Sequence, residues 1–89
     1  MSKELELLRA KLQSVDEQLV VLLAERSVIS REIGRLKIEQ GVSIKQPDVW
    51  EEMCLKRQMW ADHYKVDRQI IHDIFETIHE YSIKEQKNG

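Results

Sequence analysis

The sequence predicts an all-α fold, with one long helix followed by two shorter ones in a single domain spanning residues 1–89. Apolar residues recur in steps of three and four along most of the chain, which is the period of helices that pack against other helices. No segment shows the apolar-polar alternation of a half-buried strand. Two of the three glycines lie outside the expected helices, only Gly34 lies inside one, and the single proline stands at the first position of the second expected helix.

The first helix is expected from about Leu5 to Glu39. At a rise of 1.5 Å per residue, a helix of roughly 35 residues is about 50 Å long, which an 89-residue monomer cannot cover. We therefore expect a second copy of the chain to supply the missing contacts, as a homodimer. The apolar seam of this helix consists of Leu5, Leu8, Leu12, Val15, Leu19, Leu22, Ile29, Ile33 and Leu36.

The second helix is expected to begin at Pro47, which suits a first turn, and to run to about Tyr64. Asp67 is a plausible N-cap for a third helix that ends near Gln86. The expected inner face of the second helix carries Trp50, Met53, Arg57, Trp60 and Tyr64. The apolar stripe of the third helix is Ile71, Ile74, Phe75 and Ile78, and steps of four from Ile78 reach Ser82 and Gln86.

Composition argues against several classes of partner. The net charge is −2 with both signs mixed, so there is no basic field for nucleic acid and no polybasic membrane patch. No apolar run approaches the roughly 18 residues of a membrane span, and the N-terminus lacks the apolar stretch of a signal peptide. Cys54 is the only cysteine, which fits a reducing compartment and a cytoplasmic location.

Arg26 occupies a position of the apolar seam, between Leu22 and Ile29. An unpaired guanidinium in a dry interior is very costly, so Arg26 is expected to meet an anion. Lys37 lies eleven residues later and returns to within about 20° of the same helix face. Two cations therefore face one groove, although Arg26 could instead form a structural ion pair with Glu51 or Glu52.

Three further polar residues could join this groove. Arg9 lies seventeen residues before Arg26 and about 100° away around the helix, so its simplest route to the site is from a neighbouring copy of the chain. Ser82 and Gln86, at the inner edge of the third helix, could close the other side of the groove.

His72, Glu76 and His79 share a helix face and superficially resemble metal ligands. Because no second carboxylate cluster accompanies them, we interpret them as a solvated face and expect neither a metal nor a cofactor. Cys54 has no identifiable base beside it and is expected to be inert.

Taken together, these residues resemble the all-helical chorismate mutase family, and the match includes the related isochorismate-pyruvate lyases. The spacing agrees without a gap from Arg9 to Lys37, and the segment that ends in Gln86 is similar to the last helix of that family. The resemblance is carried by Leu8-Arg9, Val15-Asp16, Leu19, Leu22-Leu23, Glu25-Arg26, Ile33-Gly34, Lys37 and Tyr81 to Gln86.

The resemblance implies an intertwined homodimer that catalyses the Claisen rearrangement of chorismate to prephenate, a step of aromatic amino acid biosynthesis. Such a reaction needs a flexible dianionic substrate held in a reactive conformation and donors aimed at its ether oxygen. By resemblance, Arg9 of the partner chain and Arg26 would grip the carboxylates, with Ser82 in support. Lys37 and Gln86 would donate to the ether oxygen.

The sequence departs from the family at the start of the second helix, where many members carry an Arg-Glu pair. Ungapped alignment places Val49 and Trp50 there. The acidic residues that could bind substrate in this region are Asp48, Glu51 and Glu52, the last two only after a slip of one or two residues. The departure leaves three alternatives open: an isochorismate-pyruvate lyase, a 4-amino-4-deoxychorismate mutase, and a non-catalytic helical dimer that serves as a binding module.

Overall fold

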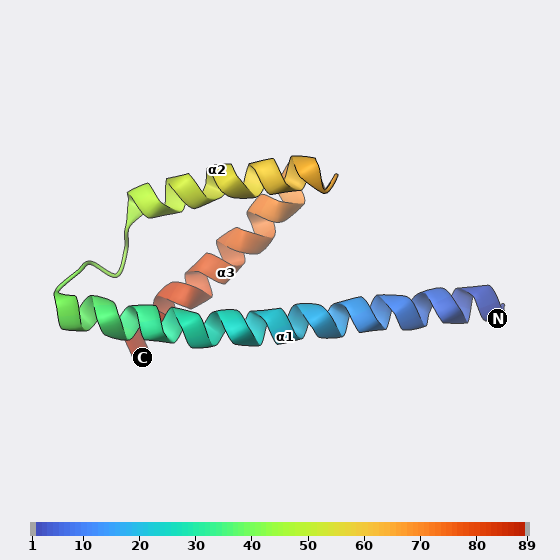
Figure 1. Ribbon diagram of the computed structural model, residues 1–89, viewed down its shortest axis with the longest axis horizontal. Helices are drawn as coiled ribbons and strands as arrows, with labels where there is room; N and C mark the ends of the chain where they lie inside the picture. Colours follow the sequence, from blue (N-terminus) through green and yellow to red (C-terminus); the bar gives the residue numbers. More distant parts are fainter. Residues whose placement is uncertain (1, 89) are drawn as a thin grey trace.

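The computed structural model describes residues 2–88, which form three α-helices joined by short connections (Figure 1). Helix α1 spans Lys3–Gln40, α2 spans Pro47–His63 and α3 spans Arg68–Asn88. The all-α prediction is confirmed, and the helix ends lie within a few residues of those expected from the sequence.

The ends of α1 are capped by local chemistry. At its start the side chain of Ser2 accepts a hydrogen bond from the backbone N–H of Leu5 at 3.2 Å. At its end Gly41 adopts a left-handed conformation with φ 67°, and the N–H of Val42 donates to the carbonyl of Lys37 at 2.8 Å. A left-handed residue followed by this hydrogen bond is a common way to end a helix, and glycine adopts the conformation without strain.

The turn between α2 and α3 is also held by specific residues. Lys65 has a positive φ of 59°, which reverses the chain after α2. Asp67 accepts a hydrogen bond from the backbone N–H of Gln69 at 2.7 Å, which confirms the predicted cap. Asp62 and Arg68 form an ion pair across the turn.

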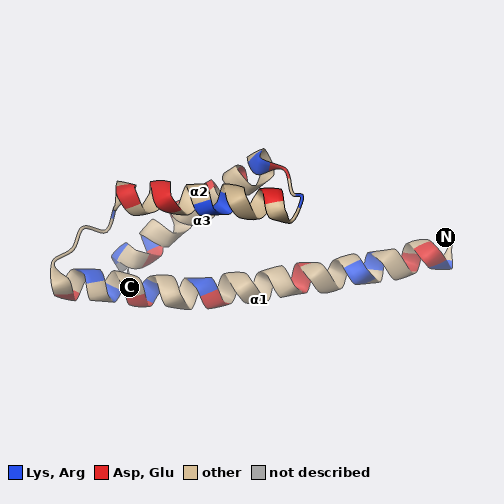
Figure 2. Ribbon diagram, turned by 45° about the horizontal axis from the view of Figure 1, so that its top comes forward, with Lys and Arg blue, Asp and Glu red and all other residues tan. Residues whose placement is uncertain are grey.

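Helix α3 packs against both α1 and α2, whereas the backbones of α1 and α2 do not come close to each other within residues 2–88 (Figure 1). The chain measures 58 × 26 × 16 Å, and the N-terminal part of α1 projects beyond the other two helices (Figure 1). Charged residues of both signs are distributed along all three helices (Figure 2). No helix within residues 2–88 combines the length and the apolar character that crossing a membrane requires.

A single chain buries very little apolar surface. Among the described residues Ala61 is the only hydrophobic residue that is buried. The predicted seam of α1 is largely exposed: Leu8 and Leu12 are each 61% exposed and Leu22 is 58% exposed. A chain with this little core lacks the main favourable term in folding, so its apolar seam requires a covering surface.

Gly34 is the point at which α3 comes closest to α1. A Cβ added at Gly34 would lie 2.5 Å from the Cα and 2.6 Å from the carbonyl oxygen of Gln86. These are backbone atoms, which cannot rotate out of the way. Only glycine therefore allows the end of α3 to lie this close to α1.

We expect Gly34→Ala to destabilise the protein despite the better helix propensity of alanine. That propensity is worth about 1 kcal/mol, whereas forcing the two helices apart costs roughly 3 kcal/mol. Urea unfolding should show a net loss of about 2 kcal/mol in the free energy of unfolding. Glu32→Ala, on the exposed opposite face of α1, serves as the control and should change stability by less than about 0.5 kcal/mol. A Gly34→Ala protein more stable than the parent would show that α3 does not pack this closely.

Candidate active site

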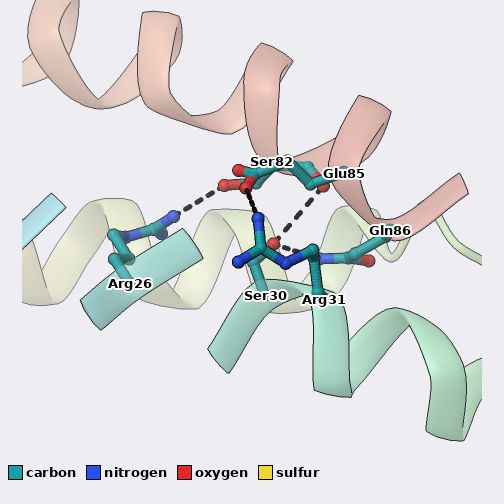
Figure 3. A network of polar contacts seen from close by, with 6 residues as sticks. All are labelled: Arg26, Ser30, Arg31, Ser82, Glu85 and Gln86. Carbon is teal, nitrogen blue, oxygen red and sulfur yellow. Dashed lines mark hydrogen bonds and ion pairs between the residues drawn. The ribbon is translucent and has the colours of Figure 1, made fainter. Parts of the chain in front are cut away.

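The polar residues of α1 and α3 meet where the two helices pack. The guanidinium of Arg26 donates from Nη1 to the hydroxyl of Ser82 at 2.7 Å (Figure 3). Further along, Lys37 Nζ donates to the side-chain oxygen of Gln86 at 2.8 Å and to the backbone carbonyl of Ile44 at 2.8 Å. The two cations that the sequence placed on one face therefore bond to the two α3 residues predicted to lie opposite them.

Ser30 holds the α3 side of this network in place. Ser30 is buried, and its hydroxyl donates to the carbonyl of Ser82 at 3.4 Å while it accepts from Gln86 Nε2 at 3.4 Å (Figure 3). The Gln86 amide is thus held at both ends, with its oxygen toward Lys37 and its nitrogen toward Ser30. An ion pair between Arg31 and Glu85, at 3.5 Å, flanks the same crossing.

A cavity of about 370 Å³ lies between the three helices, and both cation pairs of the network, Arg26 with Ser82 and Lys37 with Gln86, line it. That volume suits a small organic ligand. The cavity combines polar groups at the α1–α3 crossing with apolar walls from α1, the first loop and α2. The lining residues are Arg26, Ile29, Ser30, Ile33, Lys37, Ile44, Gln46, Val49, Trp50, Met53, Arg57, His79, Ser82, Ile83 and Gln86.

The charges of the cavity wall are of one sign. Its lining includes the cations Arg26, Lys37 and Arg57, and no aspartate or glutamate among the residues described. Burial lowers the pKa of Lys37 from its ordinary value, as expected for a cation moved away from water. Such a wall is electrostatically complementary to a small anion.

The side of the cavity formed by α2 contains residues that the sequence analysis did not assign to the site. Trp50 stacks on His79, with ring centroids 4.1 Å apart. Arg57 is buried next to them, only 7% exposed. Burial lowers the pKa of His79, and the nearby cations Arg57, Arg26 and Lys37 lower it further. A sequence signal for Arg57 did exist, since it is a cation on an apolar helix face, as Arg26 is.

The three acidic candidates of α2 lie elsewhere. Asp48, Glu51 and Glu52 are exposed, none of them lines the cavity, and Glu52 lies 4.0 Å from Lys56. The positions that face the cavity at the start of α2 are Val49 and Trp50. Arg26 donates to Ser82 in this structure and does not form the alternative ion pair with Glu51 or Glu52.

Arg9 lies on the projecting part of α1. A separation of seventeen positions from Arg26 corresponds to about 25 Å along the helix axis, and Arg9 does not line the cavity of its own chain. Its contribution to a partner's site stays a prediction.

The residues that resembled metal ligands separate into two groups. His72 lies 2.9 Å from Glu76 on the exposed surface, whereas His79 faces Trp50 in the cavity wall. In the part of the chain that the structure describes, no three His, Cys, Asp or Glu side chains are placed to hold a metal ion.

Comparison with known proteins agrees with this geometry. The family described as "Chorismate mutase type II" matches residues 8–87. The chain belongs to the type II chorismate mutase family. The resemblance inferred from Arg9 to Lys37 and from the last helix is thereby confirmed.

Two known proteins match most of this chain but differ in how much of their own length is matched. The chain is 24% identical over 87 residues to the chorismate mutase of Methanocaldococcus jannaschii, and the match covers 98% of this chain and 88% of that protein. It is 32% identical over 78 residues to the T-protein of Enterobacter agglomerans, which is 88% of this chain. The match spans only 21% of the T-protein, about a fifth of its length.

Proposed function

We propose that this protein is a chorismate mutase that rearranges chorismate to prephenate in the cavity between its helices. The observation that supports the proposal best is the pairing of Arg26 with Ser82 and of Lys37 with Gln86 in an apolar-walled cavity that no described carboxylate lines. Those groups can bind a dianion at one end and stabilise a developing negative charge at the other. Family membership supports the same activity, as does the relative named chorismate mutase.

The reaction is an intramolecular rearrangement in which the ether C–O bond breaks while a new C–C bond forms, with no proton transferred. The enzyme must hold the flexible substrate in the reactive conformation and stabilise the negative charge that builds on the ether oxygen. Lys37 and Gln86 are the donors for that oxygen, because each retains an N–H beyond those engaged in the network. Their mutual hydrogen bond at 2.8 Å holds them ready before the substrate arrives.

The charges of the cavity favour a substrate without an ammonium group. A 4-amino-4-deoxychorismate molecule would place a cation against a wall that carries Arg26, Lys37 and Arg57 and, among residues 2–88, no carboxylate. Like charges in a partly dry cavity repel, so the amino substrate is disfavoured relative to a hydroxyl one. An isochorismate-pyruvate lyase remains the second candidate, because Val49 and Trp50 line the cavity in place of the Arg-Glu pair common in the family.

We further propose that the active form is a homodimer in which each cavity receives Arg9 from the partner. The exposed seam of α1 and the distance of Arg9 from its own cavity both support this arrangement. A second seam of the same composition would bury the apolar side chains that one chain leaves exposed. The cytoplasmic location expected from the single cysteine stays a prediction.

Product identification tests the proposal. We expect incubation with chorismate to yield prephenate in proton NMR spectra, with Arg26→Ala protein as the inactive control. Formation of pyruvate and salicylate from isochorismate, without prephenate from chorismate, would replace the proposal by the lyase. Turnover of 4-amino-4-deoxychorismate alone would contradict the charge argument, and turnover of no substrate would indicate a non-catalytic binding module.

A further inference from the structure

Arg57 on α2 is unlike the other buried polar residues of the described chain. Those others, Ser30 and Ser82, both take part in the hydrogen-bond network of the cavity. Arg57 is equally buried, yet its Nε and Nη1 atoms have no hydrogen-bond partner within residues 2–88. Buried donors without acceptors are rare in folded proteins and call for an explanation, such as a ligand absent from the structure.

Aromatic rings surround the Arg57 guanidinium, and within residues 2–88 they leave those two nitrogens without an acceptor. Its guanidinium carbon lies 4.3 Å from the ring centroid of Phe75 and 5.4 Å from that of Trp50. Aromatic faces attract a cation, and they also fix where the guanidinium lies. Neither ring replaces a hydrogen-bond acceptor.

The charges nearest to Arg57 increase the cost of leaving its guanidinium without an anion. Burial lowers the pKa of Arg57, and repulsion from Arg26 lowers it further, while Cys54 acts in the opposite direction. Arg26 and Arg57 line the same cavity, so two positive charges face the space between the helices. A carboxylate placed between two guanidinium groups would remove the repulsion and accept hydrogen bonds from both.

We propose that Arg57 is a substrate-binding residue, and that one carboxylate of the substrate lies between Arg26 and Arg57. The proposal rests on the function proposed above and adds a cation from the middle of α2 to the site. It explains how the cavity binds a dianion although Val49 and Trp50, at the start of the same helix, provide no charge. Site hydrogen bonds that are incomplete in the free protein are often completed only when the ligand binds.

Arg57→Met tests the proposal, because methionine fills much of the same space without charge or donors. We expect the KM for chorismate to rise about 10- to 100-fold, the effect of losing a charge-assisted hydrogen bond. The midpoint temperature of thermal unfolding should equal or exceed that of the parent, because the variant removes a buried charge that has no ion-pair partner within residues 2–88. Arg57→Lys keeps the positive charge but loses the paired N–H donors of the guanidinium, so its KM should lie between those of the parent and of Arg57→Met.

Lys56→Met is the matched control, because Lys56 is the adjacent cation on α2 and is exposed beside Glu52. It should leave KM unchanged. If the parent converts chorismate while Arg57→Met keeps its KM and loses stability, Arg57 is a structural residue and the proposal is overturned alone. If the parent neither binds nor converts chorismate, the proposed function fails, and this inference fails with it.

Discussion

Lys37→Ala protein is expected to remain folded and to lose at least about 1,000-fold in kcat/KM for chorismate. Removing a single donor that stabilises a developing oxyanion typically costs 100- to 1,000-fold. Here the same change also leaves the side-chain oxygen of Gln86 without the donor Lys37 Nζ, so the amide is held only through its nitrogen. Turnover measured by the disappearance of chorismate absorbance, with helicity followed by circular dichroism, checks both parts.

Arg26→Ala should have an effect of similar size, since Arg26 anchors the other end of the cavity through Ser82. Lys11→Ala is the control for a lost cation, because Lys11 is exposed on α1 and lies outside the cavity lining. Near-parental rates in Lys37→Ala or Arg26→Ala protein would show that the cavity described here is not the reaction site.

Mixing two inactive variants is expected to restore activity if each site is shared between subunits. Arg9→Ala and Arg26→Ala proteins should each be inactive alone. In a mixed dimer, the site on the Arg9→Ala chain has its own Arg26 and receives Arg9 from the other chain, so one site of two is complete. Random exchange makes about half of the dimers mixed, so roughly a quarter of the parental activity should return.

The measurement is the chorismate turnover of an equimolar mixture after partial unfolding and refolding to exchange subunits. A mixture of Arg26→Ala with Lys37→Ala protein is the control, because both lesions lie on the same side of the shared site. That mixture should stay inactive. If Arg9→Ala protein is active by itself, or if its mixture with Arg26→Ala protein stays inactive, Arg9 does not serve the partner's cavity.

Much of the candidate site could be predicted because it depends on the geometry of one helix. The pitch of α1 determines that Arg26 and Lys37 share a face, whatever packs against that face. Periodicity likewise placed Ser82 and Gln86 on the apolar stripe of α3, and the structure brings both to the two cations.

The rest of the site depends on how the helices are rotated about their own axes. Helix α2 carries apolar and acidic residues on neighbouring faces, so its sequence alone left the acidic residues as substrate-binding candidates. In the folded chain α2 turns Val49 and Trp50 to the cavity, and Asp48, Glu51 and Glu52 to the exposed surface.

The sequence by itself therefore determined the three helices, the apolar seam of α1 and the side chains that share each helix face, because these follow from local hydrogen bonding and periodicity. Only the tertiary structure decided that Gly34 admits α3 to within contact of α1, and that Arg57 is buried beside Phe75 and Trp50 with two of its nitrogens lacking an acceptor within residues 2–88. Both depend on distances between residues far apart in the chain, which are set by the packing of whole helices rather than by any local pattern.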